Sequence, residues 1–533
     1  MNFLKGLGMM LGVLVILGIA QYFILAPLSP YAWSMYIYLI IIFICLAGVF
    51  YLNYEDTASE FCETAWKVVL ISGLVTFLGF PILMAVIGTP LFSANDYKTI
   101  VTIEQGDFNK DIPEALDTDI MDVKTAINIG SRVMGEIDNV SQYVISDEYN
   151  MIIYQGKTYR VSPLLYASTF KAWGNKGISG YVLVDCNTQE AKLVKLEEKI
   201  YYSPSAIFGN DLKRHVRTNY PSALIGKFQF EIDEDGKPYY IVPTYKNKIG
   251  IFTGKVLDTI LVVNASSGEI TEYTLDKLPE WIDHADSVSH MMKNANYVYT
   301  YVNGFWNTMF SQKDVKALSY NYSDSSFSGY SSIRTNNGIE YFTGVTSVNN
   351  DESNVGFLFI NPRTGKTIFY SCVGAEESSA QSSAEALVQN FGYTASYPFV
   401  VNVDGIETYL IALKDKTGTN KAYSFVNVKN YTIATQAATK EEALRLYKNA
   451  IINKGASTNN DSVNNEIKGK ITELYTAVEN STTYFYFKLE GYEQLFVSSI
   501  LNNRNQILMK VGDTVTLHAD LIDNYYLVSN INL

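Results

Sequence analysis

The chain of 533 residues is poor in cysteine, histidine and proline, with four, four and 13 of each. Four cysteines are too few for a disulfide-built scaffold or a metal site made of paired CxxC motifs. Basic residues are outnumbered, since 41 Lys and Arg against 54 Asp and Glu leave a formal net charge of −13. Nucleic acid is therefore not expected as a partner, because phosphate binding needs concentrated positive charge. Aromatic residues are abundant instead, with 40 Tyr and 27 Phe, which suits many β-strands.

The cysteines divide between two parts of the chain. Cys45 lies in an apolar run and Cys62 in a short loop, which leaves Cys186 and Cys372 in the soluble part. We expect Cys186 and Cys372 to be unpaired thiols, and a bridge between them is the alternative.

Long stretches without any charge mark the N-terminal part. Residues 6–54 contain no charged side chain, and neither do residues 68–95. A helix needs about 20 apolar residues to cross a bilayer, so the first stretch is long enough for two crossings, separated at Pro27 and Pro30. The sequence therefore predicts membrane-spanning helices at residues 3–25, 32–52 and 67–92. Apart from a lysine near the start of two of them, these spans contain no Asp, Glu, Lys, Arg or His, so transport through them is not expected.

A glycine motif and a proline in the predicted spans suggest how these helices pack and bend. Gly8 and Gly12 form a GxxxG motif in the first span, a spacing that lets two helices approach closely. We expect this motif to pack within the three-helix bundle, and self-association is the alternative. Pro81 is expected to kink the third span.

The orientation rests on weaker signals. Three spans put the amino terminus and the large C-terminal part on opposite sides of the membrane. The lysine bias is nearly flat, with Lys5 and Lys67 on one side and Lys98 and Lys110 on the other. We expect residues 96–533 outside, because a Tyr- and Asn-rich β-domain is typical of envelope proteins. The sequence thus indicates a multi-pass cell-membrane protein that contacts the lipid bilayer through residues 3–92.

One short phrase occurs three times in the soluble part. It reads YVLVDCNTQEAKLV from Tyr181, ILVVNASSGEITEY from Ile260 and FLFINPRTGKTIFY from Phe357. Four strand-forming residues lead to Asp or Asn, whose side chain favours a turn, and Gly or Gln follows. Each copy therefore predicts a β-hairpin. Further hairpins are expected at residues 150–163, 230–243 and 400–413.

A longer unit surrounds the phrase twice, in the order hairpin, helix, hairpin and then a further strand or hairpin. The expected helix begins at Ser203 and Pro204 in the first copy. The buried stripes of the two helices would be Phe208, Leu212, Val216 and Tyr220, and Ala384, Leu387, Val388 and Phe391. A closing helix has a capping box at Thr439 and Glu442 and a stripe of Ala443, Leu444, Tyr447 and Ile451.

The sequence thus predicts the α+β class: N-terminal transmembrane helices, tandem modules with a helix on an antiparallel sheet, and a C-terminal small β-barrel of OB-like type. The expected segments are 1–95, a three-helix anchor; 96–175, an α+β segment; 176–290, a first repeat; 291–350, a connecting segment; 351–452, a second repeat; 453–465, a polar linker; and 466–533, the barrel.

The repeated unit resembles the PepSY domain family. Gly236, Tyr239 and Tyr240 match its G-x-Y-x-V strand, and residues 262–270 match its V-D-x-x-T-G-x-V hairpin. The whole chain resembles a family of bacterial membrane-anchored proteins with tandem PepSY-like domains. PepSY units are associated with binding secreted peptidases and with sensing in the cell envelope. The resemblance therefore implies protein binding, and it supplies no catalytic residues.

Few residues suggest chemistry. The histidines are His215, His284, His290 and His518, and no GxSxG surrounds any serine, so a Ser-His hydrolase is not expected. The nearest approach to a metal-ligand cluster is Asp283, His284, Asp286 and His290. We expect a solvated loop there, with a metal site as the alternative.

Other polar motifs have ordinary explanations. Asp233, Glu234 and Asp235 precede a glycine without the spacing of a calcium loop, so a hairpin turn is expected. Residues 343–354 lack the GK[ST] of a phosphate loop. The tryptophans of EWID and WNTMF are expected to be buried. The sequence therefore assigns no catalytic, cofactor-binding or metal-binding residue and no cofactor.

These observations favour a membrane-anchored extracytoplasmic binding or scaffold protein that is not an enzyme. It would act through contacts with an envelope or secreted protein, possible examples being peptidases. The alternatives are a subunit of a larger membrane assembly and an envelope enzyme with a carboxylate site that has no recognisable motif. The sequence leaves the oligomeric state open.

Overall fold

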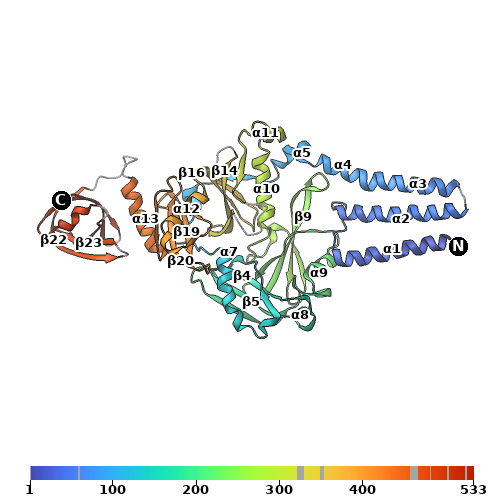
Figure 1. Ribbon diagram of the computed structural model, residues 1–533, viewed down its shortest axis with the longest axis horizontal. Helices are drawn as coiled ribbons and strands as arrows, with labels where there is room; N and C mark the ends of the chain where they lie inside the picture. Colours follow the sequence, from blue (N-terminus) through green and yellow to red (C-terminus); the bar gives the residue numbers. More distant parts are fainter. Residues whose placement is uncertain are drawn as a thin grey trace.

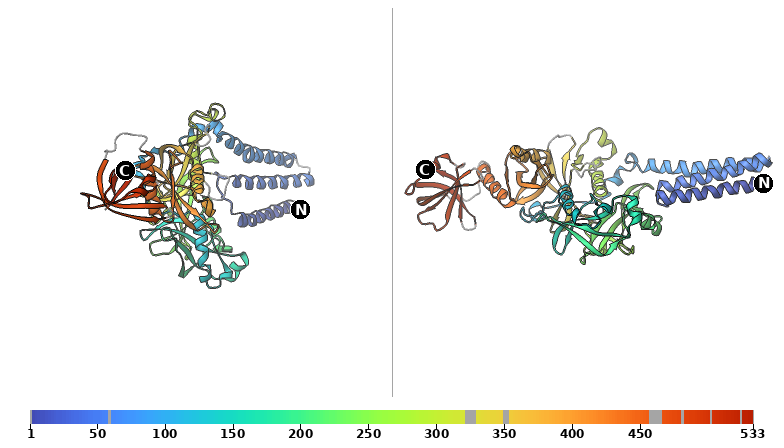
Figure 2. Two further views of the ribbon diagram at one scale, coloured as in Figure 1. Left: turned by 60° about the vertical axis from the view of Figure 1, so that its left-hand side comes forward. Right: turned by 60° about the horizontal axis from the view of Figure 1, so that its bottom comes forward.

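A computed structural model describes residues 2–57, 60–320, 329–348, 353–455, 466–479, 482–500, 503–522 and 525–532. The molecule is elongated, with three helices at one end, stacked sheets in the middle and a β-barrel at the other end (Figure 1). Figure 2 shows the same order of parts from two further directions. The expected α+β class is confirmed.

Three helical rods form the N-terminal end, and all three are long and apolar enough to span a membrane. They are α1 (Asn2–Ile24), α2 (Trp33–Thr57), and a third rod made of α3 (Glu60–Leu74), a π-helical turn (Val75–Gly79) and α4 (Phe80–Ile87). The third rod begins and ends earlier than predicted. It ends before Pro90, which starts the short helix α5 (Pro90–Tyr97).

The π-helical turn lies directly before Pro81, where the sequence predicts a kink. Because proline has no N–H to donate to the carbonyl four residues earlier, the local helix geometry must change. The carbonyl concerned belongs to Phe77, within the π-helical turn. The irregularity therefore starts about one turn before the proline.

The helices approach one another at glycines other than the GxxxG motif. A Cβ added to Gly6 would lie 2.9 Å from Val49 Cγ1, and one added to Gly73 would lie 2.8 Å from Phe43 Cβ. Within the described residues, no atom lies within 4 Å of a Cβ added to Gly8 or Gly12. The prediction that this motif packs inside the bundle is therefore wrong, and self-association through it stays a prediction.

The centre of the molecule contains the same unit four times, where the sequence predicted two copies. In each unit a helix precedes five strands, and the first two strands both pair with the third. Unit 1 (residues 123–200) contains α7 (Val123–Gly130), β2 (Tyr143–Ile145), β3 (Asn150–Tyr154), β4 (Lys157–Tyr166), α8 (Thr169–Gly174), β5 (Ile178–Asp185) and β6 (Ala191–Ile200). Unit 2 (residues 212–273) contains α9 (Leu212–Asn219), β7 (Leu224–Ile225), β8 (Gln229–Ile232), β9 (Pro238–Ile249), β10 (Thr253–Asn264) and β11 (Ile270–Tyr273).

The second half repeats this arrangement. Unit 3 (residues 288–375) contains α10 (Val288–Thr300), α11 (Phe305–Met309), β12 (Lys316–Leu318), β13 (Ser331–Thr335), β14 (Gly338–Ser347), β15 (Ser353–Ile360) and β16 (Thr367–Ala375). Unit 4 (residues 377–437) contains α12 (Glu377–Ala386), β17 (Thr394–Ala395), β18 (Phe399–Val403), β19 (Ile406–Lys414), β20 (Asn420–Asn427) and β21 (Ala434–Ala437). An additional strand, β1 (Ile103–Gln105), pairs in parallel with β16.

The units divide the chain differently from the expected segments. The boundary expected after residue 175 separates β4 from β5, and the one after residue 350 separates β14 from β15, although both pairs are hydrogen-bonded. The boundary after residue 290 cuts α10. The expected boundaries are misplaced because each repeated phrase forms the last two strands of its unit. The expected segments treated the phrase as the start of a unit.

The units pack in pairs. Buried side chains of units 1 and 2 form one hydrophobic core, and those of units 3 and 4 form another. The segment between α5 and unit 1 joins the second core through four buried side chains, Phe108, Ile112, Ala115 and Ile120. It includes the short helix α6 (Phe108–Asp111).

The repeated phrase forms the same turn each time. The side-chain Oδ1 of Asp185, Asn264 and Asn361 accepts hydrogen bonds from the backbone N–H groups two and three residues later. The residue four positions on has a left-handed backbone, with φ between 59° and 79°, and is Gln189, Gly268 or Gly365. The phrase therefore encodes a hairpin turn, which confirms the three predicted hairpins.

Variable side chains in these turns join neighbouring units. Gln189 Nε2 donates to Tyr423 OH of unit 4 at 2.9 Å. Arg363 Nη2 donates to Leu278 O at 2.8 Å, in the loop after unit 2. Ser266 Oγ donates to Glu198 O of unit 1 at 3.2 Å. The Asp or Asn thus forms the turn in each copy, while side chains that differ between the copies hold the units together.

The predicted helices are shorter than expected, and their stripes are only partly buried. In α9, Leu212 and Val216 are buried as predicted, but the helix starts after Asp211, whose Oδ1 accepts from Arg214 N at 2.7 Å. Ser203 therefore does not start it, and Phe208 is exposed. In and after α12, the buried apolar side chains are Ala380, Ala384 and Val388, whereas Leu387 and Phe391 are exposed.

The closing helix α13 (Lys440–Gly455) covers β20 and β21. Thr439 Oγ1 accepts from Glu442 N at 3.3 Å, as the capping box predicts. Its residues Ala443, Leu444 and Tyr447 are buried. The expected linker is part of this helix up to Gly455, and residues 456–465 lie outside the described residues.

A closed five-stranded barrel completes the chain. Its strands are β22 (Glu466–Glu479), β23 (Thr482–Leu489), β24 (Leu495–Ser499), β25 (Thr514–Ile522) and β26 (Tyr525–Asn532). They follow one another around the barrel in the order β22-β23-β24-β26-β25, and only the β24–β26 pair is parallel among the described strands.

Candidate functional site

Arg160 differs from its counterparts in the other units. It pairs with Val184, the residue immediately before the turn residue Asp185. The equivalent positions are occupied by Tyr240, Tyr341 and Tyr409, each paired with a residue that directly precedes an Asn. Unit 1 therefore has a cation where units 2, 3 and 4 have a phenol.

The guanidinium of Arg160 is buried, and no carboxylate of the described residues forms a salt bridge with it. The residue is 3% exposed. Its Nε and Nη2 donate to Met121 O at 2.9 and 2.7 Å, and its Nη1 donates to Tyr149 O at 3.1 Å. Within the described part of the chain, its hydrogen-bond partners are these carbonyls alone. A buried charge without an opposite charge is costly, so an anion at this position would be stabilised.

Arg160 lines a cavity of about 230 Å³ between units 1, 2 and 3. The other wall residues include Tyr149, Lys227, His284, Tyr330 and Tyr341. Lys227 Nζ lies 3.0 Å from Glu148 Oε1 at the same cavity. The ring centre of Tyr341 lies 5.8 Å from that of Tyr330 and 5.6 Å from that of His284. The cavity wall is thus aromatic, and it carries two basic side chains, Arg160 and Lys227, and one acidic side chain, Glu148.

Behind one wall of the cavity, Glu231 binds the backbone and the His284 ring of the segment that follows unit 2. Its carboxylate accepts from Asp283 N and His284 N, both at 2.8 Å, and lies 2.9 Å from His284 Nδ1. Both Glu231 and His284 are fully buried. These bonds hold residues 283 and 284 against β8.

Asp283 faces unit 1. Its Oδ2 accepts from Ile153 N at 2.7 Å. Burial and the nearby charge of Glu231 raise the pKa of Asp283 to about 7. The carboxyl group therefore joins the segment after unit 2 to unit 1, and its burial disfavours the ionised form.

Asp286 and His290 form a separate network. His290 Nδ1 lies 2.6 Å from Asp286 Oδ2, and His290 Nε2 lies 2.9 Å from Lys255 O. Tyr245 OH donates to Asp286 Oδ1 at 2.8 Å. The expectation of a solvated loop at these residues is wrong, because Glu231 and Tyr245, distant in sequence, bury them. Among the described residues, no three or more His, Cys, Asp or Glu side chains converge as metal ligands.

The remaining candidate residues have structural surroundings. His215 Nε2 lies 2.7 Å from Gly268 O, and His518 lies on β25 of the barrel. Asp233 forms the predicted hairpin turn, since its Oδ1 accepts from Asp235 N and Lys237 N.

The two tryptophans differ from each other. Trp281 is half-buried against Tyr239, with ring centres 4.8 Å apart. Trp306 is 60% exposed, so the prediction that it is buried is wrong.

A further buried carboxylate, that of Glu377, lies between units 3 and 4. Ser319 Oγ donates to Glu377 Oε2 at 3.1 Å, and burial raises the pKa of Glu377. A Cβ added to Gly344 would lie 1.9 Å from Glu377 Oε1, so only glycine fits there. Glycine at position 344 therefore lets the Glu377 carboxylate pack directly against β14.

Comparison with known proteins does not identify the chain: no protein-family model matches it, and a search of curated proteins gives no match. The site is therefore defined by its own geometry. Arg160 was not singled out from the sequence, because a lone arginine in a strand is typical of an exposed face. Alignment of TYRVSP with PYYIVP in the repeated hairpins would have indicated it, since it replaces a tyrosine.

Proposed function

We propose that the protein is a membrane-anchored, extracytoplasmic binding protein that acts through protein–protein contacts in the cell envelope. The observation that carries this proposal is the buried Arg160 guanidinium, which lines an accessible cavity and has only carbonyl partners among the described residues. An acidic side chain of a partner protein would supply the missing negative charge.

The size of the cavity favours one side chain as its occupant. Small-molecule pockets usually have volumes of about 300–1,000 Å³, and this cavity measures about 230 Å³. A Glu or Asp side chain fits such a space, and its carboxylate can form charge-assisted hydrogen bonds with Arg160. Tyr330 and Tyr341 supply the aromatic surface that is frequent at protein interfaces.

Binding is a better match than turnover for the surrounding groups. A general base must reach a substrate proton, and a nucleophile must be within reach of a base. Glu231 is instead bonded to two backbone N–H groups and to His284, and Asp286 is bonded to Tyr245 and His290. These bonds make the acids parts of the framework, so we propose no enzymatic activity and no cofactor.

The architecture supports the same reading. The repeated helix-on-sheet unit fits a PepSY-like domain, a type associated with peptidase binding and regulation. The order of the barrel strands, with a parallel pair of the third and fifth strands, fits an OB-like barrel. Three apolar helices anchor this assembly, and we propose that residues 96–533 lie outside the cell.

One observation favours the alternative that the chain is a subunit of a larger membrane assembly. The barrel exposes Ile507, Leu508 and Val511, each more than 60% accessible. Figure 1 shows the barrel at the end of the molecule farthest from the helices. Clustered aliphatic side chains in that position suit a lasting contact with another subunit.

Site-specific photo-crosslinking tests the proposal. Benzoylphenylalanine replaces Ser289, an exposed residue on the cavity wall, and the full chain is irradiated in intact membranes. The proposal predicts one protein adduct whose crosslinked segment is acidic, and loss of that adduct in R160Q. Arg132→Gln is the matched control, because Arg132 is exposed and donates to Thr419 in another part of the molecule. An adduct of equal yield in R160Q would refute the role of Arg160.

A further inference from the structure

Three aromatic side chains on one side of the soluble part are exposed to an unusual degree. Phe170 is 89% accessible, Trp173 is 71% accessible and Phe208 is 54% accessible. The rings of Trp173 and Phe208 meet edge to face, with centres 5.5 Å apart. They border a hollow of about 530 Å³ next to α8. We call Phe170, Trp173 and Phe208 the aromatic patch.

The patch lies beside the end of the first membrane helix. Arg214 Nη1 donates to Phe208 O at 2.7 Å. The same guanidinium lies 4.2 Å from the ring centre of Tyr22 and donates to Tyr22 O at 3.4 Å, near the end of α1. One side chain therefore connects the patch to a residue of the membrane span.

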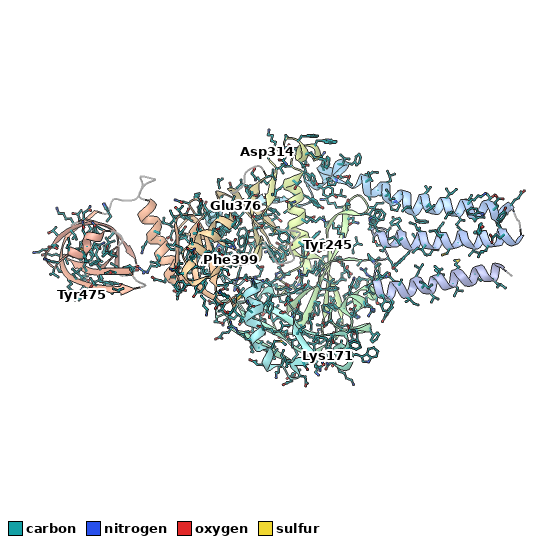
Figure 3. The ribbon with its side chains drawn as sticks, in the orientation of Figure 1. Lys171, Tyr245, Asp314, Glu376, Phe399 and Tyr475 are labelled. Carbon is teal, nitrogen blue, oxygen red and sulfur yellow. The ribbon has the colours of Figure 1, made fainter. Side chains whose placement is uncertain are left out.

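Unit 2 is fixed in this position by further bonds to the chain after α1. Arg217 is buried, and its Nε donates to Leu25 O at 3.1 Å. Leu28 N donates to Pro221 O at 2.9 Å. Figure 1 shows α8 and α9 at the end of the soluble part nearest α1, and Figure 3 shows Lys171 of α8 on that side. The second view of Figure 2 agrees.

The charge around the patch is positive. Residues 168–177 and 204–217 contain four Lys and Arg besides the buried Arg217, and one acid, Asp211, whose side chain caps α9. Aromatic rings prefer the bilayer interface, and basic side chains are attracted by anionic headgroups. Residues of both kinds therefore occur together at the level where the first span ends.

We infer that the aromatic patch inserts into the interfacial region of the bilayer that holds α1 to α4. Phe170, Trp173 and Phe208 lie among the headgroups, and the neighbouring Lys and Arg bind anionic lipid. This contact is a second attachment of the soluble part, offset from the three spans, and it fixes the angle at which unit 1 stands on the membrane. It depends on the membrane spans alone and not on the function of the Arg160 cavity.

Tryptophan quenching by lipid tests the inference. The full chain is reconstituted in vesicles of phosphatidylcholine and phosphatidylglycerol, with and without bromine on the acyl chains. The emission of Trp173 is taken as the difference between wild type and W173F. We expect brominated lipid to quench this emission and acrylamide to leave it unquenched. When proteolysis releases the soluble part into detergent-free buffer, the emission should shift to the red. The matched control is W281F, because Trp281 packs on Tyr239.

Two outcomes would overturn the inference. In the first, the Trp173 emission is quenched by acrylamide and not by brominated lipid, which means that the patch faces water. In the second, it is shielded in native membranes but open to acrylamide in pure lipid, which means that a protein covers it. The double variant F170S/W173S gives an independent readout and is expected to fold, because both side chains are exposed. Trypsin should cut it at Lys171 or Lys176 in vesicles, where the wild type resists.

Discussion

Arg160 and Tyr341 occupy the same register position in two different sheets and line the same cavity. Each pairs with the residue before the turn of the repeated phrase, Val184 in one case and Ile360 in the other. Tyr341 is buried with aromatic neighbours, whereas Arg160 brings a charge into an otherwise uncharged position of the repeat. The four units therefore share one framework, and a single departure from it produces the candidate binding site.

A free carboxylate should bind in the Arg160 cavity and stabilise the protein. Ligands that bind only the folded state raise its thermal midpoint. We expect sodium acetate to raise the unfolding temperature of the full chain in nanodiscs above the value in sodium chloride of equal ionic strength. R160Q should lose this difference, and R132Q should keep it. Equal responses of wild type and R160Q to acetate would show that the guanidinium has no affinity for carboxylates.

The titration of Asp283 should appear in the pH dependence of stability. Its pKa is about 7 in the folded chain, against an ordinary value of about 3.9 in unfolded chains. The folded state therefore holds the proton more tightly, so the stabilisation is complete below about pH 4 and is lost as pH rises through about 7.

Asp283→Asn keeps an oxygen for Ile153 N and cannot ionise. Relative to wild type, D283N should thus gain stability as pH rises from about 4 to about 7, measured as the free energy of unfolding, with no further gain above that range. D138N is the control, because the Asp138 side chain is 84% exposed. A difference between D283N and wild type that shrinks as pH rises would contradict the assignment.

The amide of the repeated turn should contribute measurable stability. Asn264 and Asn361 each accept two backbone hydrogen bonds, and each lost bond costs about 0.5–1.5 kcal/mol. N264A and N361A should therefore each lower the free energy of unfolding by about 1–2 kcal/mol in urea titrations. N187A is the matched control, because Asn187 lies in the equivalent turn of unit 1 and is exposed. Equal losses in all three variants would show that the turn side chains are not responsible.

Much of this architecture could be predicted from local patterns. The charge-free stretches predicted three membrane-length helices, and the phrase predicted hairpins at the right residues, because both signals depend on neighbouring side chains. Units 1 and 3 were not recognised as repeats. Helix α7 has only eight residues, and the hairpin β13–β14 lies in the expected connecting segment, where Asn337 and Gly338 are its local turn signal.

The candidate site could not be predicted in the same way, because it depends on contacts between distant residues. Glu231 and His284 are separated by 53 positions, yet their bond buries a segment that reads as a polar loop. Arg160 lies 181 positions before Tyr341 in the sequence, and the cavity exists only when units 1, 2 and 3 are packed together. A cluster of charged residues in a short stretch of sequence indicates a solvated surface. Here, packing against distant residues buries that stretch instead.

The two cysteines of the central units should be inert in the folded protein. Cys186 and Cys372 are buried free thiols, and burial raises the pKa of Cys372 to about 12. Because the thiolate is the reactive form, a maleimide should leave both unlabelled in native C45S/C62S and label both after denaturation in SDS. Rapid native labelling, or a peptide bridged between the two residues under non-reducing conditions, would contradict this.

The side of the membrane on which residues 96–533 lie tests the account most directly, because a partner in the envelope can reach the Arg160 cavity only from outside. Proteinase K is added to intact cells, and the barrel at residues 466–533 is followed with an antibody. The account predicts that the barrel signal disappears without lysis. Survival of the signal in intact cells, with loss only after the membrane is opened, would contradict it.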